Sequence, residues 1–217
     1  MSLHADRSQR IVVLPDNRIW SERKDGESVC ALETIPGRLE SSFVRLSGGN
    51  LLDRAGEDLE VLLLEGLLEV GGRDWPTGSY LRIAGGSGLT LLSKHPSLLF
   101  LKSGQFPEED RKSAGLETSG ARFSPGLVPG LSVLPLFSGG TANTALVRWD
   151  PGTIFQPHRH FGGEEILVVS GTFEDEHGAY PAGSWYRAPH MSRHHPFSTE
   201  GCLIFVKTGH LMESNAA

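Results

Sequence analysis

The chain repeats itself, and this repeat limits the possible folds more than any other feature of the sequence. Residues 59–84 align without a gap to residues 164–189 at an offset of 105 positions, and glycines and prolines recur with them, so that Gly66 meets Gly171. A second pair of segments matches at the same offset, LLFLKSG at 98–104 with LIFVKTG at 203–209. An internal repeat of this kind predicts two copies of one structural unit.

Each copy has the sequence pattern of an antiparallel β-sheet protein. Its apolar, β-branched segments are short, and turns rich in glycine, proline and aspartate separate them; the chain holds 27 glycines and 13 prolines. No long segment shows the period of an amphipathic helix. We therefore expect an all-β fold of two packed barrels or sandwiches. The predicted domains are an N-terminal one at 18–106, a polar linker at 107–119 and a C-terminal one at 120–217.

Composition argues against several classes of partner. The net charge is −6 and lysine and arginine form no basic run, so we expect no nucleic-acid partner. No apolar run approaches the ~20 residues that span a bilayer, and the first residues are too polar for a signal peptide, so no membrane association is expected. Cys30 and Cys202 are the only cysteines and cannot form a disulfide framework. This indicates a reducing compartment, the cytoplasm.

A group of histidines in the second copy suggests a metal site. His158 and His160 are one residue apart, and in an extended strand such residues point to the same face. A turn through the following FGG would bring Glu164 back beside them, and His194 lies further along near the start of another strand. Three imidazoles and one carboxylate suit Zn, Fe, Mn, Ni or Cu better than Ca or Mg.

The first copy serves as an internal control for these residues. An HxH pair alone is more often part of a polar exposed face than a metal site. At the offset of the repeat, the four candidate ligands align in order with Asp53, Ala55, Leu59 and Leu89. The duplicated scaffold therefore forms without metal-binding residues, which points to a function for those of the second copy. Asp53 and Glu60 of the first copy are interpreted as surface charges.

Several neighbours of the candidate ligands have other interpretations. Glu165 follows Glu164 and should point to the opposite face of an extended strand, as should His195 beside His194; a register shift of one residue would exchange the two histidines. Aromatic residues flank the ligand segments, and those that face inward would form an apolar pocket wall: Trp149, Phe155, Phe161, Trp185, Tyr186 and Phe197.

The second copy resembles a cupin. The first cupin motif, G-x5-HxH-x3-E-x6-G, is matched by Gly152, His158, His160, Glu164 and Gly171. In the second motif Gly183, Pro189 and His194 match, whereas Met191 replaces a glycine and Ser198 an asparagine. Within the cupins, residues 120–210 are similar to the ChrR-like group. The resemblance implies two tandem cupin barrels of the jelly-roll type, the first degenerate. It also implies one divalent transition metal, Zn or Fe with Mn or Ni as alternatives, held by His158, His160, Glu164 and His194.

The resemblance leaves the activity open. One hypothesis is a sensor, regulatory or small-molecule-binding protein; the alternative is an Fe(II)-dependent dioxygenase acting on a β-diketone or hydroxyketone, with O2 as a second ligand. A storage or isomerase-like cupin is a third. ChrR-type anti-sigma factors carry a separate helical zinc-binding domain, and this sequence has no matching helical segment or cysteine pair, so a sigma-factor partner is not expected. The family resemblance implies a homodimer. No catalytic residue and no organic cofactor is assigned.

Overall fold

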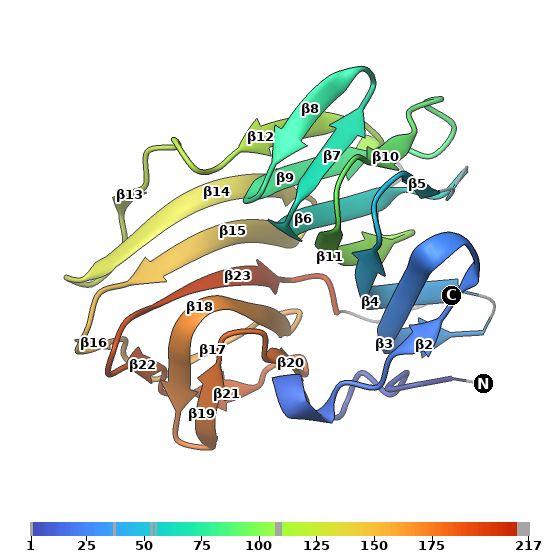
Figure 1. Cartoon of the computed structure of the whole chain (residues 1–217). Coiled ribbons are helices and arrows are strands. Elements are labelled where there is room, and N and C mark those ends of the chain that lie inside the picture. The colour runs from blue at the N-terminus through green and yellow to red at the C-terminus, as the bar shows by residue number, and fades with distance from the viewer. Residues whose placement is uncertain (1, 37, 53, 55, 107–109, 212–217) are drawn as a thin grey trace. The chain divides into compact units, whose positions relative to one another are not determined.

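A computed structural model describes residues 2–36, 38–52, 54, 56–106 and 110–211 (Figure 1). Helical structure among them includes two short 3-10 turns, η1 (Pro15–Asn17) and η2 (Lys24–Gly26), and Asp110 also has 3-10 conformation. The chain divides into two compact units: one contains the first residues up to Ala5 and then Ile19–Ala121, and the other contains Asp6–Arg18 and the chain from Arg122 onward. The predicted all-β fold of two tandem cupin barrels is confirmed.

The first unit is built from two antiparallel sheets that share one core. The seven-stranded sheet has the order β12-β9-β6-β11-β4-β3-β2 and the four-stranded sheet the order β5-β10-β7-β8. Leucines and valines of both sheets form the core cluster between them. The strands are β2 (Ser21–Glu22), β3 (Glu27–Ile35), β4 (Arg38–Leu46), β5 (Asn50–Leu52), β6 (Leu59–Glu65), β7 (Leu67–Val70), β8 (Arg73–Pro76), β9 (Ser79–Ile83), β10 (Leu91–Ser93), β11 (Ser97–Ser103) and β12 (Ala114–Glu117).

The second unit has a ten-stranded sheet and a small two-stranded one. The main path of the large sheet is β1-β20-β18-β23-β15-β14-β13, and β17 pairs only with β21. Its strands are β1 (Ile11–Val13), β13 (Ser124–Pro125), β14 (Leu131–Gly139), β15 (Ala142–Trp149), β16 (Thr153–Ile154), β17 (His158–Arg159), β18 (Glu164–Asp175), β19 (Gly178–Pro181), β20 (Trp185–Ala188), β21 (Arg193–His194), β22 (Phe197–Ser198) and β23 (Cys202–Thr208).

The strand register repeats between the units at the offset found in the sequence. Leu59 pairs with Ile83 on β9 and with Ser103 on β11. Glu164 occupies the same place in the second unit, since it pairs with Ala188 on β20 and Thr208 on β23. The sequence alignment is therefore a true structural equivalence, and any two residues 105 apart in these strands can be compared directly.

One acidic residue is buried at the same place in both units, which corrects the interpretation of Glu60 as a surface charge. Glu60 is 3% exposed and accepts a hydrogen bond from the Tyr80 hydroxyl at 2.7 Å. Its equivalent, Glu165, accepts one from Trp185 Nε1, also at 2.7 Å. These carboxylates belong to the shared scaffold, because both copies keep them together with an aromatic donor. Asp53 lies outside the described residues, as does Ala55.

The edge of the main sheet is covered in each unit by a strand from outside the repeat. In the first unit β12 pairs with β9, and in the second unit β1 pairs with β20. Residues 6–18 thus pack as an N-terminal arm on the second unit. The predicted domain boundaries, 18–106 and 120–217, remain predictions. Residues 107–109 of the predicted linker lie outside the described residues, and its later part forms β12.

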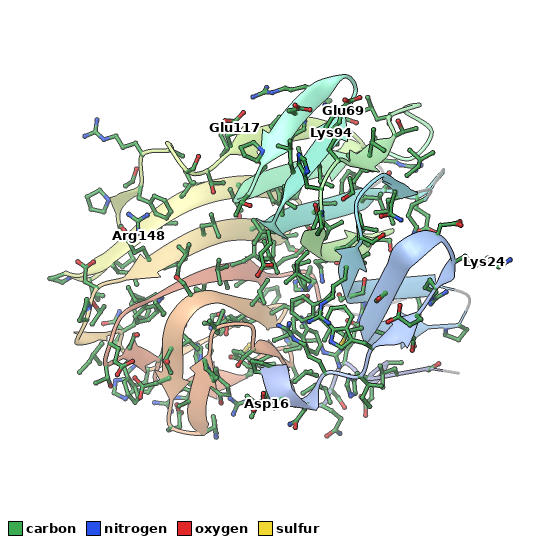
Figure 2. All side chains as sticks on the ribbon, in the orientation of Figure 1. Asp16, Lys24, Glu69, Lys94, Glu117 and Arg148 are labelled. Carbon is green, nitrogen blue, oxygen red and sulfur yellow. The ribbon has the colours of Figure 1, made fainter. Side chains whose placement is uncertain are left out.

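Exposed charges of the first unit form ion pairs at the surface. Figure 2 shows Glu69 and Lys94 close together; Lys94 Nζ lies 2.8 Å from Glu69 and 2.7 Å from Asp74. Hydrogen bonds to Asp74 and Glu69 raise the pKa of Lys94. Exposed pairs of this kind add little to stability.

Candidate metal centre

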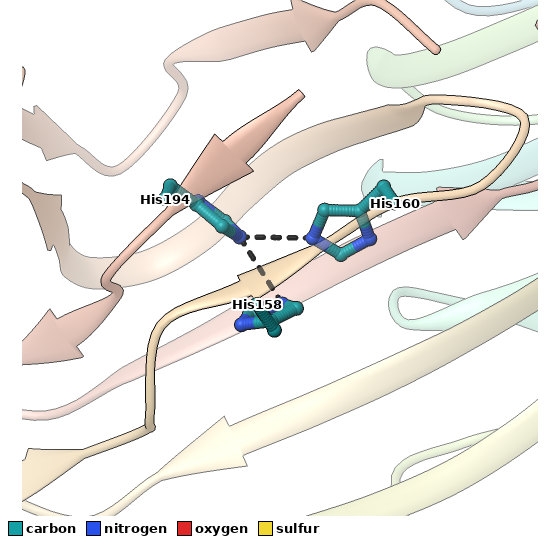
Figure 3. Close-up of side chains that lie close together, drawn as sticks. All are labelled: His158, His160 and His194. Atoms are coloured by element: carbon teal, nitrogen blue, oxygen red, sulfur yellow. Dashed lines mark hydrogen bonds between the residues drawn. The ribbon is translucent and has the colours of Figure 1, made fainter. Parts of the chain in front are cut away.

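The histidines that the sequence singles out lie on two paired strands. His158 on β17 is directly opposite His194 on β21, and directly opposed residues point to the same face of a sheet. His160 follows β17, and its backbone N–H donates to the Ser192 carbonyl at 3.1 Å. Figure 3 shows the three imidazoles pointing toward one another.

A glycine turn brings Glu164 to this group. Gly162 and Gly163 both have positive φ, +76° and +74°, and the Gly163 N–H donates to the His160 carbonyl at 3.1 Å. A Cβ atom at Gly162 would lie 2.6 Å from the Gly209 Cα, so only glycine fits. The chain reverses here and enters β18 at Glu164.

The three histidines lie close together, and Glu164 approaches two of them. The Nε2 atom of His194 lies 2.9 Å from Nε2 of His160 and 3.3 Å from Nε2 of His158. The carboxylate oxygens of Glu164 lie 3.3 Å from His160 Nε2 and 3.6 Å from His194 Nε2. Two ligand atoms that are each about 2.05 Å from an ion are about 2.9 Å apart at a right angle and about 3.3 Å apart at the tetrahedral angle. The histidine group can hold a metal ion.

Hydrogen bonds at the far side of two rings favour this arrangement. His158 Nδ1 lies 2.9 Å from the Gln156 carbonyl oxygen, so Nδ1 carries the proton and the Nε2 lone pair faces the other imidazoles. His194 Nδ1 lies 3.4 Å from the Tyr186 hydroxyl and 3.7 Å from Asp175 Oδ2. Such partners set the tautomer and orientation of metal-binding histidines.

Burial lowers the pKa of two of the histidines and so favours their neutral form. Burial, with the neighbouring His194 and His158, lowers the pKa of His160 to about 3, and burial also lowers the pKa of His158. Neutral imidazole is the form that binds metals. Burial raises the pKa of Glu164, against the opposing effects of His194 and the hydrogen bond from Tyr186. A nearby cation would offset the unfavourable burial of this carboxylate.

A polar network surrounds the histidine group, and most of it was missed at the sequence level. The Tyr186 hydroxyl donates to Glu164 at 2.7 Å. Asp175 accepts hydrogen bonds from the Tyr180 hydroxyl at 2.9 Å and from Arg10 at 2.9 Å. Burial raises the pKa of Asp175, but the neighbouring His194, the hydrogen bond from the His177 N–H and the charge of Arg10 outweigh it and hold the pKa at about 2.

The repeat contained a signal for three of these residues. At the offset of 105, Asp175, Tyr180 and Tyr186 align with apolar core residues of the first unit, namely Val70, Trp75 and Leu81. Polar groups in one copy that replace apolar core in the other mark the surroundings of the site. Arg10 lies outside the repeat, so this comparison could not have found it.

A small apolar cavity borders the candidate ligands. Its volume is about 130 Å³. Of the aromatic residues expected to form a pocket wall, Trp149 and Phe155 line it, whereas Phe161 is 62% exposed. The complete lining is Leu131, Val147, Trp149, Phe155, His158, Glu164, Ile166, Phe173, His194, Pro196, Ile204 and Val206.

Comparisons with known proteins identify the domain that carries this group. Residues 111–212 match the family model described as the ChrR cupin-like domain. The second barrel therefore matches the ChrR cupin-like domain, and the chain as a whole has the bicupin fold. No curated protein was found to match the bicupin.

Solved structures share the fold over 78% to 97% of the chain. A "putative dioxygenase" from Nostoc punctiforme has a TM-score of 0.76 at 14% identity, covering 96% of this chain and 85% of the other. A variant of oxalate decarboxylase from Bacillus subtilis has a TM-score of 0.61 at 16% identity, covering 97% and 80%. A variant of salicylate 1,2-dioxygenase from Pseudoaminobacter salicylatoxidans has a TM-score of 0.58 at 11% identity, covering 78% and 68%. At these identities the likeness concerns the fold alone.

The two departures from the second cupin motif have a structural meaning in this bicupin. Met191, which replaces the motif glycine, has a φ of +61°, a left-handed conformation that costs a non-glycine residue about 1–2 kcal/mol. Its N–H donates to the His160 carbonyl at 2.9 Å, so the strained turn is tied to the site. Ser198 is buried, and its hydroxyl donates to the Thr172 carbonyl at 2.6 Å.

The remaining candidates lie away from the histidine group. His195 is exposed, and its backbone N–H donates to Glu176. Glu165 is buried in the scaffold position described above, where His210 Nε2 also lies 3.0 Å from it. In the described part of the bicupin, no helix is long and apolar enough to cross a membrane.

Proposed function

We propose that the second barrel binds one divalent transition-metal ion through the Nε2 atoms of His158, His160 and His194 and a carboxylate oxygen of Glu164. The convergence of these four donors carries the proposal. Their chemistry suits iron or zinc, with manganese and nickel as further options. Four protein ligands leave one open position on a five-coordinate ion and two on an octahedral ion, where an outside ligand could bind.

The cavity supports the binding of a small molecule at this ion. A structural zinc site is closed by its four protein ligands and requires no space beside it. Here His158, Glu164 and His194 form part of a cavity wall. When bound, the metal would supply Lewis-acid chemistry and a template for an oxygen-bearing ligand.

The cavity lining limits the class of ligand. Its volume of about 130 Å³ is close to that of an engineered protein cavity of about 150 Å³ that binds benzene. Among the described residues that line it there is no lysine or arginine to pair with a carboxylate. A β-diketone or hydroxyketone with one small apolar substituent fits such a site better than a dianion such as oxalate.

The enzymatic form of this proposal is an Fe(II)-dependent dioxygenase. Both atoms of O2 would enter the cleaved ketone, so the reaction needs no separate reductant. A protein described as a "putative dioxygenase" and a salicylate 1,2-dioxygenase variant share the fold, and so does an oxalate decarboxylase variant. The apolar cavity favours a ketone substrate for this chain over oxalate.

Metal analysis and O2 uptake on anaerobically purified protein test the proposal. We expect about one iron per chain and O2 uptake with pentane-2,4-dione but not with oxalate. His160→Ala should abolish both metal content and uptake. His195→Ala is the matched control, since His195 neighbours a candidate ligand but is exposed. Full metal content in His160→Ala would contradict the ligand assignment.

A sensor or regulatory role is the second candidate, and the match to the ChrR cupin-like domain favours it. It predicts stoichiometric zinc and no O2 uptake with any ketone. We also propose a homodimer, which light scattering would test, and a cytoplasmic location. Cys30 and Cys202 are both buried and are not joined in a disulfide, in keeping with a reducing compartment.

A further inference from the structure

The N-terminal arm, residues 6–18, is fixed to the second barrel on both sides of Arg10. Strand β1 pairs with β20, so that Val12 is opposite Tyr186. Arg187 donates to the Asp6 carbonyl at 2.9 Å, and Arg18 donates to the Gly183 carbonyl. Arg10 lies between these anchors, directly before β1.

The Arg10 guanidinium is held by a carboxylate and two aromatic rings. It donates to Asp175 Oδ2 at 2.9 Å and to the Tyr180 hydroxyl. Its carbon lies 5.0 Å from the centre of the Tyr186 ring and 5.7 Å from that of Tyr180. These two rings are stacked at 5.6 Å. A planar guanidinium suits such a combination of ion pair and stacking better than an ammonium does.

Asp175 connects this arginine to the histidine group. Its side chain is fully buried, and Oδ2, the oxygen that pairs with Arg10, lies 3.7 Å from His194 Nδ1. The other oxygen accepts from the Tyr180 hydroxyl and from the His177 N–H at 2.8 Å. Removing one partner of a buried ion pair leaves an uncompensated charge, so the Asp175 side chain should move away from its place beside His194 without Arg10.

The first barrel shows that the fold itself does not need this arginine. Its own edge strand, β12, pairs with β9 so that Ala114 is opposite Arg82, just as Ile11 is opposite Arg187. Ser113 therefore occupies the place of Arg10. Its hydroxyl only accepts a hydrogen bond from the Ala84 N–H at 3.0 Å. In both barrels a strand covers the edge of the sheet. Only the barrel that contains the histidine group has an arginine at this position.

We propose that Arg10 is a positioning residue for the metal centre, which orients His194 through Asp175 and makes the N-terminal arm part of the site. The inference rests on the proposed metal binding. Loss of a second-layer partner of a metal-binding histidine typically weakens metal affinity by about 10- to 100-fold. Arg10→Ala and Asp175→Asn should each do so without changing which residues bind the ion.

Co(II) titration of the full-length apoprotein tests the proposal, with affinity from chelator competition and ligand geometry from the visible spectrum. We expect Arg10→Ala and Asp175→Asn to bind Co(II) at least about tenfold more weakly, with shifted visible bands. The double variant should be no weaker than the weaker single one, because both changes break the same link. Arg10→Lys should recover part of the affinity.

Arg18→Ala is the matched control, because Arg18 anchors the same arm to the same barrel at a distance from the histidines. The Co(II) affinity of Arg18→Ala should stay within about twofold of that of the wild type. An equal loss in Arg18→Ala, or wild-type affinity in both Arg10→Ala and Asp175→Asn, would overturn the positioning role while leaving metal binding intact. A wild-type protein that binds no Co(II) would overturn the proposed function and this inference together. If Arg10→Ala does not fold, Asp175→Asn and Arg10→Lys still decide between these outcomes.

Discussion

The two barrels have the same strand register but bury different side chains at equivalent positions. Glu164 pairs with the same strand positions as Leu59, and both residues are buried. In the first barrel Leu59 and Leu89 line a cavity of about 260 Å³, twice as large as the one beside the histidines. Glu164 is thus a buried charge that the fold of the first barrel does without, which makes it a candidate for function.

This comparison separates two adjacent glutamates. Glu165 has the equivalent Glu60, and both accept a hydrogen bond from an aromatic donor on the neighbouring strand. Glu164 has only Leu59 as its equivalent. Adjacent positions on one strand thus serve the scaffold on one face and the site on the other.

The largest expected effect is the loss of metal from the second barrel alone. Removing His194 deletes a central donor, so His194→Ala should weaken metal binding by more than about 100-fold, or roughly 2.7 kcal/mol. Leu89→Ala, at the equivalent position, should leave the metal content at about one ion per chain. Metal analysis after dialysis against a weak chelator measures both. Two ions per wild-type chain would break the comparison, because the first barrel would then bind metal too.

The next effect concerns stability and should occur in both barrels. Glu165→Ala leaves the Trp185 N–H and the His210 ring without their buried acceptor, and Glu60→Ala does the same to the Tyr80 hydroxyl. Each change should lower the free energy of unfolding by about 2 kcal/mol. Urea unfolding of the metal-free protein measures it.

Glu164→Gln provides the contrast to these scaffold variants. Burial raises the pKa of Glu164, which means that its ionised form destabilises the metal-free fold at neutral pH. The glutamine variant should therefore be as stable as wild type or more so, yet bind metal poorly. A large loss of metal-free stability in Glu164→Gln would place this residue in the scaffold instead.

A smaller effect is expected from Tyr186, whose equivalent is Leu81. Tyr186→Phe removes the hydroxyl that donates to Glu164 at 2.7 Å and lies 3.4 Å from His194 Nδ1. We expect metal affinity to fall by about tenfold and stability to change by about 1 kcal/mol. Isothermal titration and urea unfolding check the two numbers. Unchanged affinity would show that the hydroxyl does not help to orient the site.

The internal repeat and the motif spacing were enough to predict the fold class and the grouping of the histidines. The duplication predicted two β-barrels, and the motif spacing predicted that His158, His160 and His194 lie close together. Burial of Glu60 was not predicted, because a carboxylate is seldom buried without a partner and its partner, Tyr80, lies on a different strand. The contribution of Arg10 was not predictable either, since a contact between Arg10 and Asp175 depends on tertiary structure and not on any local pattern.

The smallest expected effect concerns the turn that ends at the site. Met191 has a φ of +61°, and its equivalent in the first barrel, Gly86, has a φ of +75°. Met191→Gly restores the residue that this conformation favours, but it also increases the entropy of the unfolded chain by about 0.5–1 kcal/mol. The net gain in stability should thus be at most about 1 kcal/mol. Met191→Val should instead be destabilising, because a β-branched residue tolerates positive φ least. Thermal unfolding of the three proteins should give melting temperatures that fall in the order glycine, methionine, valine. A valine variant as stable as the glycine variant would show that the turn is not strained and that the first barrel keeps its glycine for another reason.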